Sequence, residues 1–238
     1  MSRRAVILAG GKGTRLRPYT VVLPKPLMPL GDYPILEVIV RQLSNHGFHH
    51  ITMAVNHHAN LIKAFFGDGA RWRVQIDYSL ENQPLSTIAP LCLIPDLPEN
   101  FLLMNGDVLT DLNIGALYAR HVSEQRLFTI SAARRTQVID YGVLQVDTSN
   151  ILTGFSEKPA TQYLVSMGIY VVNRTILSLV PPSRAYGFDD LMCDLLSRGQ
   201  RVSVEPYGGY WSDIGRPDDY LHALEDFDQK RLQFLPNE

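Results

Sequence analysis

A glycine-rich loop with two basic side chains near the start of the chain is suited to binding phosphate. The apolar run Ala5–Ala9 leads into it; the run is too short for a helix and is bounded by glycines, so it indicates a buried strand. The glycines of Gly10–Gly13 let the backbone turn sharply, and successive N–H groups in such a turn form an anion-binding nest. Arg15 and Lys25 add fixed positive charge beside the loop. The residues therefore predict a strand, a phosphate-binding loop and two cations.

A carboxylate is expected at the same edge of the sheet. Asp107 follows the hydrophobic run Phe101–Met104, which has the character of a buried strand. Ligands of an open parallel sheet bind outside the carboxyl ends of its strands, so Asp107 should meet Lys25 and the glycine loop there. A carboxylate in that place can hold Mg²⁺, which prefers oxygen ligands and nucleotide phosphates. The alternative is that Asp107 caps a following helix.

The loop matches neither of two common phosphate-binding motifs. A Walker A loop needs Ser or Thr where Gly13 stands, and a dinucleotide fingerprint needs glycine where Leu16 stands. The full string Leu8–Thr20, closed by Pro24-Lys25-Pro26, instead resembles the signature of the sugar-1-phosphate nucleotidyltransferases, also called NDP-sugar pyrophosphorylases. The alternative is an ordinary glycine-rich loop with a solvated arginine and lysine.

The resemblance implies a fold, a reaction and a set of site residues. The implied fold is Rossmann-like α/β: a mixed, mostly parallel sheet flanked by helices, with a small β-rich sugar-binding portion. The implied reaction joins a nucleoside triphosphate to a sugar 1-phosphate, giving NDP-sugar and pyrophosphate with Mg²⁺ as cofactor. Arg15, Lys25 and Asp107 would be catalytic, and Asp213 would be the second metal ligand unless it is only a turn residue before a helix near Pro217. The implied nucleotide-binding residues are Leu8, Ala9, Gly10, Gly11, Gly13, Thr14, Arg15, Lys25, Gln83, Pro84, Ser86, Thr87, Asn105 and Gly106.

The implied sugar-phosphate site comes from a later part of the chain. Glu157-Lys158-Pro159 matches a family element in which the glutamate accepts hydrogen bonds from sugar hydroxyls and the lysine meets the sugar phosphate. Tyr141-Gly142 resembles the family's sugar-contacting glycine, and Gly168 aligns with a strand that borders the sugar pocket. The alternative for Glu157-Lys158 is a surface ion pair, and the alternative for Tyr141-Gly142 is a hairpin turn. Gly168 could instead be a glycine that relieves crowding.

One loop departs from the family pattern. After Pro84-Leu85 the family usually has Gly-Thr-Ala-Gly, whereas here Ser86 replaces the first glycine. A positive φ at that position would strain a serine or reshape the loop, which faces the base, so nucleotide choice is affected more than activity. Gln83 can both donate and accept hydrogen bonds on a base edge. A helix is expected to begin near Thr87, with Pro90 in its first turn.

The base and the sugar stay open at this stage. The compact chain most resembles guanylyltransferases for mannose or heptose 1-phosphate, with a uridylyl- or thymidylyltransferase as the alternative. A regulatory relative that binds nucleotide sugar without catalysis is a third reading, against which the intact Arg15, Lys25, Asp107 and Asp213 argue. Family members with acyltransferase activity carry a further hexapeptide-repeat domain, so that activity is not expected here.

Composition narrows the class of protein. The 238 residues are 45% hydrophobic and 19% charged with a net charge of −2, which suits one α/β domain and predicts neither nucleic-acid nor membrane partners. The two cysteines make no disulfide framework, and the apolar run after Met1 is too short for a signal peptide. We therefore expect a cytoplasmic protein. A homo-oligomer is left open. Five histidines have zinc-like spacing, but solvated loop positions are the favoured reading: His46, His49, His50, His57 and His58.

The pattern of apolar runs predicts the elements that position these residues. Helices are expected at 34–46, 60–66 and 189–198, and a surface helix at 218–235. Alternating strands and helices in the first half predict a largely parallel sheet, and the stretch 127–172 should include antiparallel strands. We divide the single domain into a nucleotide-binding part (about 1–126), a sugar-phosphate part (about 127–215) and a helical tail (216–238). The expected strands are Ile51–Val55, Val74–Tyr78, Phe101–Met104, Phe128–Ala132, Val143–Val146, Ile169–Val172 and Val202–Val204.

Overall fold

The fold is built on a seven-stranded mixed sheet. The computed structural model describes residues 3–11, 13–56 and 59–236. The strands lie in the order β12-β8-β11-β6-β1-β4-β5, and all pair in parallel except β11, which is antiparallel to both β6 and β8. This confirms the expected α/β fold with an antiparallel portion in the later half. The strands are β1 (Arg4–Leu8), β4 (His50–Val55), β5 (Gln75–Leu80), β6 (Asn100–Asn105), β8 (Phe128–Val138), β11 (Ala160–Asn173) and β12 (Val202–Tyr207).

Smaller elements complete the chain. Three two-stranded sheets pair β2 (Pro29–Leu30) with β3 (Tyr33–Pro34), β7 (Val108–Thr110) with β13 (Trp211–Asp213), and β9 (Gly142–Val146) with β10 (Leu152–Glu157). The α-helices are α1 (Ile35–Asn45), α2 (Ala59–Phe66), α3 (Ile114–Ser123), α4 (Phe188–Ser197) and α5 (Pro217–Phe234). The 3-10 helices are η1 (Thr14–Leu16), η2 (Tyr19–Val21), η3 (Lys25–Leu27), η4 (Ala70–Trp72), η5 (Ala89–Leu93) and η6 (Arg174–Leu179).

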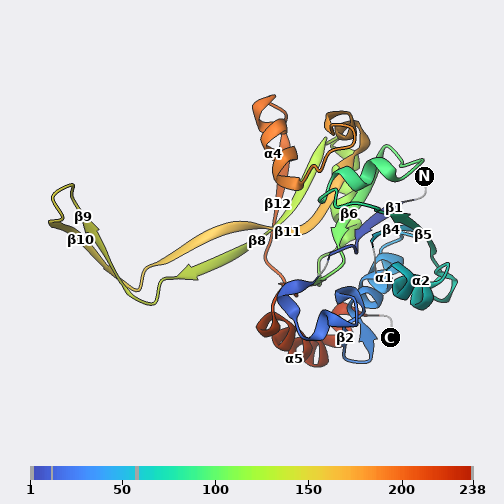
Figure 1. Cartoon of the computed structure of the whole chain (residues 1–238), viewed down its shortest axis with the longest axis horizontal. Coiled ribbons are helices and arrows are strands. Elements are labelled where there is room, and N and C mark those ends of the chain that lie inside the picture. Colours follow the sequence, from blue (N-terminus) through green and yellow to red (C-terminus); the bar gives the residue numbers. More distant parts are fainter. Residues whose placement is uncertain (1–2, 12, 57–58, 237–238) are drawn as a thin grey trace.

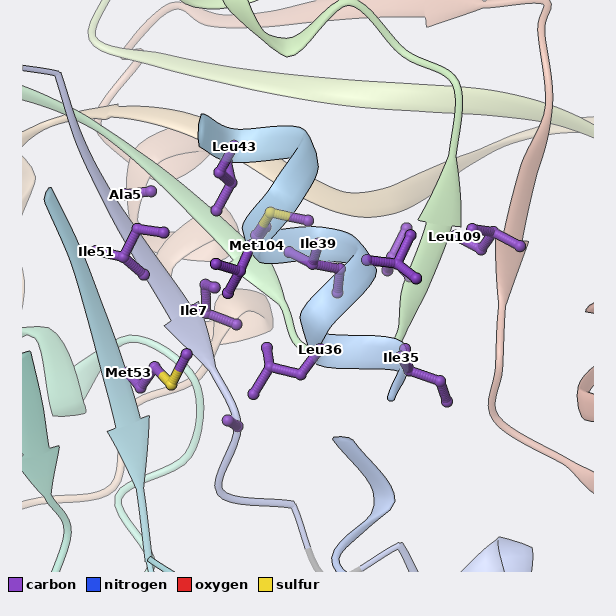
Figure 2. Packing of buried hydrophobic residues seen from close by; sticks show 14 of the residues in the cluster. Ala5, Ile7, Ile35, Leu36, Ile39, Leu43, Ile51, Met53, Met104 and Leu109 are labelled. Carbon is purple, nitrogen blue, oxygen red and sulfur yellow. The ribbon is translucent and has the colours of Figure 1, made fainter. Parts of the chain in front are cut away.

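Two hydrophobic layers cover the two faces of the central sheet. On one face, α1 packs Leu36, Ile39 and Leu43 against side chains of β1, β4 and β6 (Figure 2). On the other face, Phe101 and Phe128 lie in a cluster with residues of η5, η6 and α4. Because both faces are buried, the central strands β1, β4 and β6 are mostly apolar, as expected for parallel strands between helices. The carboxyl ends of these strands are thereby held in a rigid frame.

Three helices differ from the sequence-based expectation. The helix expected near Thr87 is the short 3-10 helix η5, with Pro90 in its first turn as predicted. Helix α3 was not predicted; Asn113, whose side chain accepts from the Ala116 N–H at 2.9 Å, caps it. The tail helix α5 is more than a surface helix, since Ala223 and Phe227 are fully buried in the core. The alternation of charged and apolar residues was interpreted as a surface pattern, although the buried apolar residues of α5 form one face that packs against the core.

A long ribbon leaves the body of the protein. Strands β8 and β11 continue beyond the sheet as a two-stranded ribbon, and β9 and β10 extend it (Figure 1). We call residues 133–166 the arm, and the junction of its two ribbons, residues 139–142 and 157–159, the elbow. The arm stands clear of the rest of the chain in Figure 1. Within the described ranges, no helix combines the length and apolar character needed to cross a membrane.

Candidate active site

A cavity of about 490 Å³ lies at the carboxyl ends of β1, β4, β5 and β6. Most of the predicted nucleotide-binding residues line it, namely Leu8, Ala9, Gly10, Gly11, Lys25, Gln83, Pro84, Ser86, Thr87, Asn105 and Gly106. At Gly106 an added Cβ would lie 3.1 Å from the Leu8 carbonyl, so a larger residue would disturb the pairing of these strand ends. The parallel strands bring together segments far apart in sequence, as the rule for open sheets predicts.

Lys25 and Asp107 form an ion pair at the floor of this cavity. The Lys25 ammonium donates a hydrogen bond to Oδ2 of Asp107, and its side chain is only 10% exposed. The other carboxylate oxygen, Oδ1, is buried and has no hydrogen-bond partner among the described residues. A buried carboxylate oxygen without a partner is costly, so this atom is positioned for a ligand that supplies positive charge or a proton donor. Asp107 does not cap α3, which begins at Ile114.

The short sheet of β7 and β13 brings Asp213 to Asp107. Asp213 pairs with Val108 in the register, and the Ile214 N–H donates to the Asp107 carbonyl at 3.0 Å. Burial and the neighbouring negative charge of Asp107 raise the pKa of the Asp213 carboxyl above its usual value, while Lys25 and Arg15 oppose that shift. Two neighbouring carboxylates repel one another and offer the oxygen ligands that Mg²⁺ prefers, and a divalent cation between them would relieve that repulsion. The donor set therefore fits Mg²⁺, with further oxygens required from a ligand.

Arg15 lies beside Asp213, and Gly13 lies beside Lys25, but neither Arg15 nor Gly13 is in the wall of the cavity. A Cβ at Gly215 would lie 3.6 Å from Nη2 of Arg15 and 3.3 Å from Oδ2 of Asp213, so these side chains converge on that glycine. Gly13 has φ +60°, and its carbonyl accepts from Thr20 Oγ1 at 2.6 Å. This left-handed conformation lets the chain turn into η1, which carries Thr14 and Arg15. The exposed Arg15 faces solvent at the edge of the site.

The loop that departs from the family pattern has the positive φ considered above. Ser86 has φ +70°, a conformation that favours glycine. The loop is held by a later segment: Ile88 and Ala89 donate to the Tyr186 carbonyl at 3.0 Å, and the Phe188 N–H donates to Thr87 Oγ1 at 2.8 Å. These hydrogen bonds to the segment at the start of α4 hold Ser86 in its strained conformation.

The predicted sugar-phosphate residues lie in two places. Gly168 is buried next to the cavity, with φ +72°, and an added Cβ would lie 2.5 Å from Nδ2 of Asn105. Tyr141, Gly142, Glu157 and Lys158 instead lie together at the elbow of the arm. Gly142 pairs with Glu157 across the ribbon, and Lys158 pairs with Asp140 at 2.7 Å in an exposed ion pair. The structure brings these four together but not to the cavity.

Comparisons with known proteins agree with this geometry. Residues 4–230 match the family described as nucleotidyl transferase. The chain belongs to this family. It is 32% identical to the UTP–glucose-1-phosphate uridylyltransferase of Synechocystis sp. and 30% identical to the mannose-1-phosphate guanylyltransferase of Mycobacterium tuberculosis. Each match covers 93% of this chain but only 62% and 64% of the two relatives, so the chain spans less than two thirds of their length.

Solved nucleotidyl transferase structures share the fold. A putative glucose-1-phosphate thymidylyltransferase from Bacillus anthracis superposes with a TM-score of 0.75 at 23% identity, covering 94% of both chains. HddC from Yersinia pseudotuberculosis gives a TM-score of 0.73 at 25% identity, covering 94% of this chain and 99% of HddC. The seven-stranded sheet with its flanking helices is therefore the architecture of known family members.

Sequence reasoning missed several residues of this nucleotidyl transferase site. Asn56 and Glu81 line the cavity, and Oε1 of Glu81 accepts a hydrogen bond from the Leu85 N–H, which closes the loop before Ser86. Both follow parallel strands of the central sheet, β4 and β5, so the rule that located Asp107 could have found them. Trp211 donates its indole N–H to the Met167 carbonyl at 3.0 Å, beside Gly168.

The histidines form no metal centre within the described ranges, where no group of three or more His, Cys, Asp or Glu side chains could hold a metal ion. His50 pairs with Asp77 at 2.5 Å, and His46 is half-buried with its pKa lowered by burial and by Arg3. His57 and His58 lie outside the described residues.

Proposed function

We propose that this chain transfers a nucleotidyl group from a nucleoside triphosphate to a sugar 1-phosphate. The observation that carries the proposal is the convergence of Lys25, Asp107 and Asp213 at the end of the cavity formed by the glycine-rich loop and the strand ends. Family membership and the named activities of the relatives support the same reaction class. The presence of all three side chains also favours an enzyme over an inactive nucleotide-sugar-binding relative.

The proposed reaction needs charge and positioning rather than a protein nucleophile. A phosphate oxygen of the sugar 1-phosphate attacks the α-phosphorus, the bond from that phosphorus to the bridging oxygen breaks, and pyrophosphate leaves. The attacking phosphate is already ionised, so no general base is required. Lys25 holds the α-phosphate, Arg15 holds the leaving phosphates and the glycine-loop N–H groups orient the triphosphate.

Mg²⁺ is the proposed cofactor. Asp107 and Asp213 would hold it, and the ion would supply charge neutralisation for the triphosphate and the leaving pyrophosphate. Two observations support this assignment: Oδ1 of Asp107 has no hydrogen-bond partner within the described part of the chain, and the charge of Asp107 lies close enough to Asp213 to raise the pKa of its carboxyl. Mg²⁺ commonly binds through one or two carboxylates plus phosphates and waters, so we expect tight binding only with nucleotide present.

For the substrates we propose GTP with a mannose- or heptose-type 1-phosphate. Mannose-1-phosphate guanylyltransferases from bacteria, fungi and flies are among the relatives about 30% identical to this chain, which supports guanine. The uridylyltransferase of Synechocystis sp. supports the alternative of uridylyl or thymidylyl transfer. A cytoplasmic location suits the two exposed free cysteines, Cys92 and Cys193.

A matrix assay tests the proposal directly. Each of GTP, UTP, dTTP, CTP and ATP is combined with mannose, glucose, galactose and heptose 1-phosphates in the presence of Mg²⁺, and released pyrophosphate is measured. We expect one dominant pair, with the corresponding NDP-sugar identified by mass. Nucleotide binding without pyrophosphate release in any combination would contradict transferase activity and favour the regulatory reading.

A further inference from the structure

A second cavity, also of about 490 Å³, lies between the later half of α1 and the turn that carries η4. This volume is in the range of small-molecule sites, about 300–1,000 Å³. Within the described part of the chain, it shares no lining residue with the first cavity, and no aspartate or glutamate lines it. We call it the arginine cavity; its polar and aromatic lining residues are Arg41, Ser44, Asn45, Arg71, Trp72 and Arg73.

One wall of the arginine cavity is held by a buried carboxylate. The Glu37 side chain is only 2% exposed. Its Oε1 accepts from the Trp72 indole N–H at 3.0 Å and from Nε and Nη2 of Arg41 at 2.9 and 2.7 Å. Ser44 Oγ donates to the Trp72 carbonyl at 3.1 Å, which joins α1 to the turn. Arg41 and Trp72 are therefore fixed by the same oxygen, so a change at Arg41 should alter the hydrogen bond of the Trp72 indole.

The turn at η4 brings two more arginines to the same cavity. Arg73 has φ +57°, a left-handed conformation that strains a residue with a long side chain, and its N–H donates to the Ala70 carbonyl at 3.0 Å. The Arg71 guanidinium carbon lies 5.2 Å from the centre of the Trp72 ring, within the range of a cation–π contact. Arg71 and Arg73 therefore flank the tryptophan in sequence and line one cavity with it.

The arginine cavity carries two positive charges that the described residues do not neutralise. Glu37 already pairs with Arg41. Arg71 and Arg73 are exposed, and neither has a carboxylate within ion-pair distance in the described ranges. A doubly charged phosphate group balances both charges, whereas a single carboxylate balances only one. Arginine also matches phosphate geometry, because its planar group donates two parallel N–H bonds, and the Asn45 amide offers further donors.

We propose that the arginine cavity binds a phosphate-bearing small molecule, with Arg71 and Arg73 as the main contacts to its phosphate. This site is separate from the proposed transfer site, so it gives the protein a second place at which phosphate compounds bind. A sugar phosphate and pyrophosphate, which the proposed reaction consumes and releases, carry the required group, as does inorganic phosphate. These three compounds are the probes, and binding at this site does not depend on whether the chain transfers nucleotides.

The two tryptophans of the chain, Trp72 and Trp211, provide a direct test. In a proton–nitrogen correlation spectrum each indole N–H gives one signal, and Trp211→Phe identifies which is which. Inorganic phosphate, pyrophosphate and glucose 1-phosphate are titrated without Mg²⁺ or nucleotide, against sodium chloride at matched ionic strength. We expect a saturable shift of the Trp72 signal with at least one of the three phosphates and none with chloride. The compound that saturates the signal at the lowest concentration distinguishes the three sources of the phosphate group.

A paired variant locates the site. Arg71→Ala/Arg73→Gly removes both charges, and glycine suits the positive φ at position 73, so the fold should be kept. We expect this variant to weaken phosphate binding at Trp72 at least about tenfold, since it removes two charge-assisted contacts. Arg71→Ala alone replaces it if the paired variant folds poorly. Arg201→Ala, exposed and outside both cavities, is the control and should bind phosphate as the wild type does.

The outcomes also separate this site from the proposed transfer site. Lys25→Ala should leave the titration of Trp72 unchanged, and loss of that titration would place binding in the first cavity and overturn the inference. A Trp72 signal that moves only as it does in chloride, or that saturates equally in the arginine variant, overturns it as well. A wild type whose Trp72 signal saturates but which releases no pyrophosphate contradicts the proposed function alone.

Discussion

The cavity and the arm differ in how the fold holds their functional side chains. Around the cavity, Lys25 is buried and Asp107 follows a strand with helices on both faces. On the arm, Glu157 and Lys158 lie on a ribbon exposed on both faces. Rigid, low-dielectric surroundings strengthen electrostatic contacts, whereas an exposed pair contributes little until a partner excludes water.

This difference suggests a division of roles between the body and the arm of the chain. In our proposal the body carries the charge that phosphoryl transfer needs, which must be preorganised. The arm carries the residues proposed for sugar recognition, and these lie on an exposed ribbon. Variants of the body should therefore change turnover, and variants of the arm should change affinity for the sugar 1-phosphate. Four substitutions test this division, beginning with the largest expected effect.

Lys25→Ala should lower turnover by about 10²–10³, since it removes one preorganised contact to developing charge. The fold should survive, because η3 keeps its prolines and its place against α1. Steady-state kinetics and circular dichroism measure the two effects. Lys63→Ala on the exposed face of α2 is the matched control and should leave turnover unchanged. Near-wild-type turnover of Lys25→Ala would make this lysine a structural partner of Asp107 only.

Asp213→Asn should raise the Mg²⁺ concentration needed for half-maximal rate about tenfold or more and reduce the maximal rate, because it removes one of two carboxylate ligands. Asp107→Asn should behave alike, and the double variant should lose much less than the sum of the two effects, since both act through one ion. Rates measured across a Mg²⁺ titration test this. The exposed Asp218→Asn serves as the control. If Asp213→Asn has the same Mg²⁺ dependence as the wild type, Asp213 is not a metal ligand and has only a structural role in its turn.

Glu157→Gln should raise the KM for sugar 1-phosphate several-fold while the Kd for nucleotide stays the same. The change keeps the shape of the side chain but weakens its capacity to accept hydrogen bonds from hydroxyls. Titration calorimetry with nucleotide and kinetics with sugar 1-phosphate separate the two affinities. Glu225→Gln, on the exposed face of α5, is the control. An equal loss of affinity for nucleotide and for sugar 1-phosphate would contradict the assignment of sugar binding to the arm and nucleotide binding to the body.

Ser86→Gly should shift the relative kcat/KM values of GTP, UTP and dTTP, because glycine relaxes the strained loop at the cavity wall. We expect a change of a few-fold in these ratios, the smallest of the four effects. Ser183→Gly is a matched control, since Ser183 also has a positive φ, +56°, but is exposed outside the cavity. Identical nucleotide ratios in wild type and Ser86→Gly would exclude this loop from base selection.

Local signals in the sequence were sufficient for most of the body. Apolar runs located β1, β4 and β6, and the strand-end rule then placed the glycine loop, Lys25 and Asp107 at one edge. The register of β7 with β13, which brings Asp213 to Asp107, has no local signal, because a three-residue strand has no periodicity. The motif resemblance singled out Asp213 as a candidate ligand, and the structure shows that it lies next to Asp107.

The arm could not be derived in the same way. Apolar, β-rich runs predicted parts of β8, β9 and β11 but not β10, and such runs record only a preference for extended backbone. They do not record whether a face meets the protein core or remains exposed, as at Leu144 and Phe155. For the same reason, α5 was assigned to the surface although Phe227 is fully buried. Which surface covers an apolar face is a tertiary property.

The pairing of β7 with β13 joins two carboxylates that are synthesised at different times. Asp107 is synthesised 106 residues before Asp213. At roughly 5–20 residues per second, the ribosome adds the second carboxylate about 5–20 seconds after the first. Lys25 precedes both and pairs with Asp107 in the finished fold. Lys25 is therefore available to pair with the partly buried Asp107 before β13 is synthesised, and the pair of acids is complete only after β13 has been added.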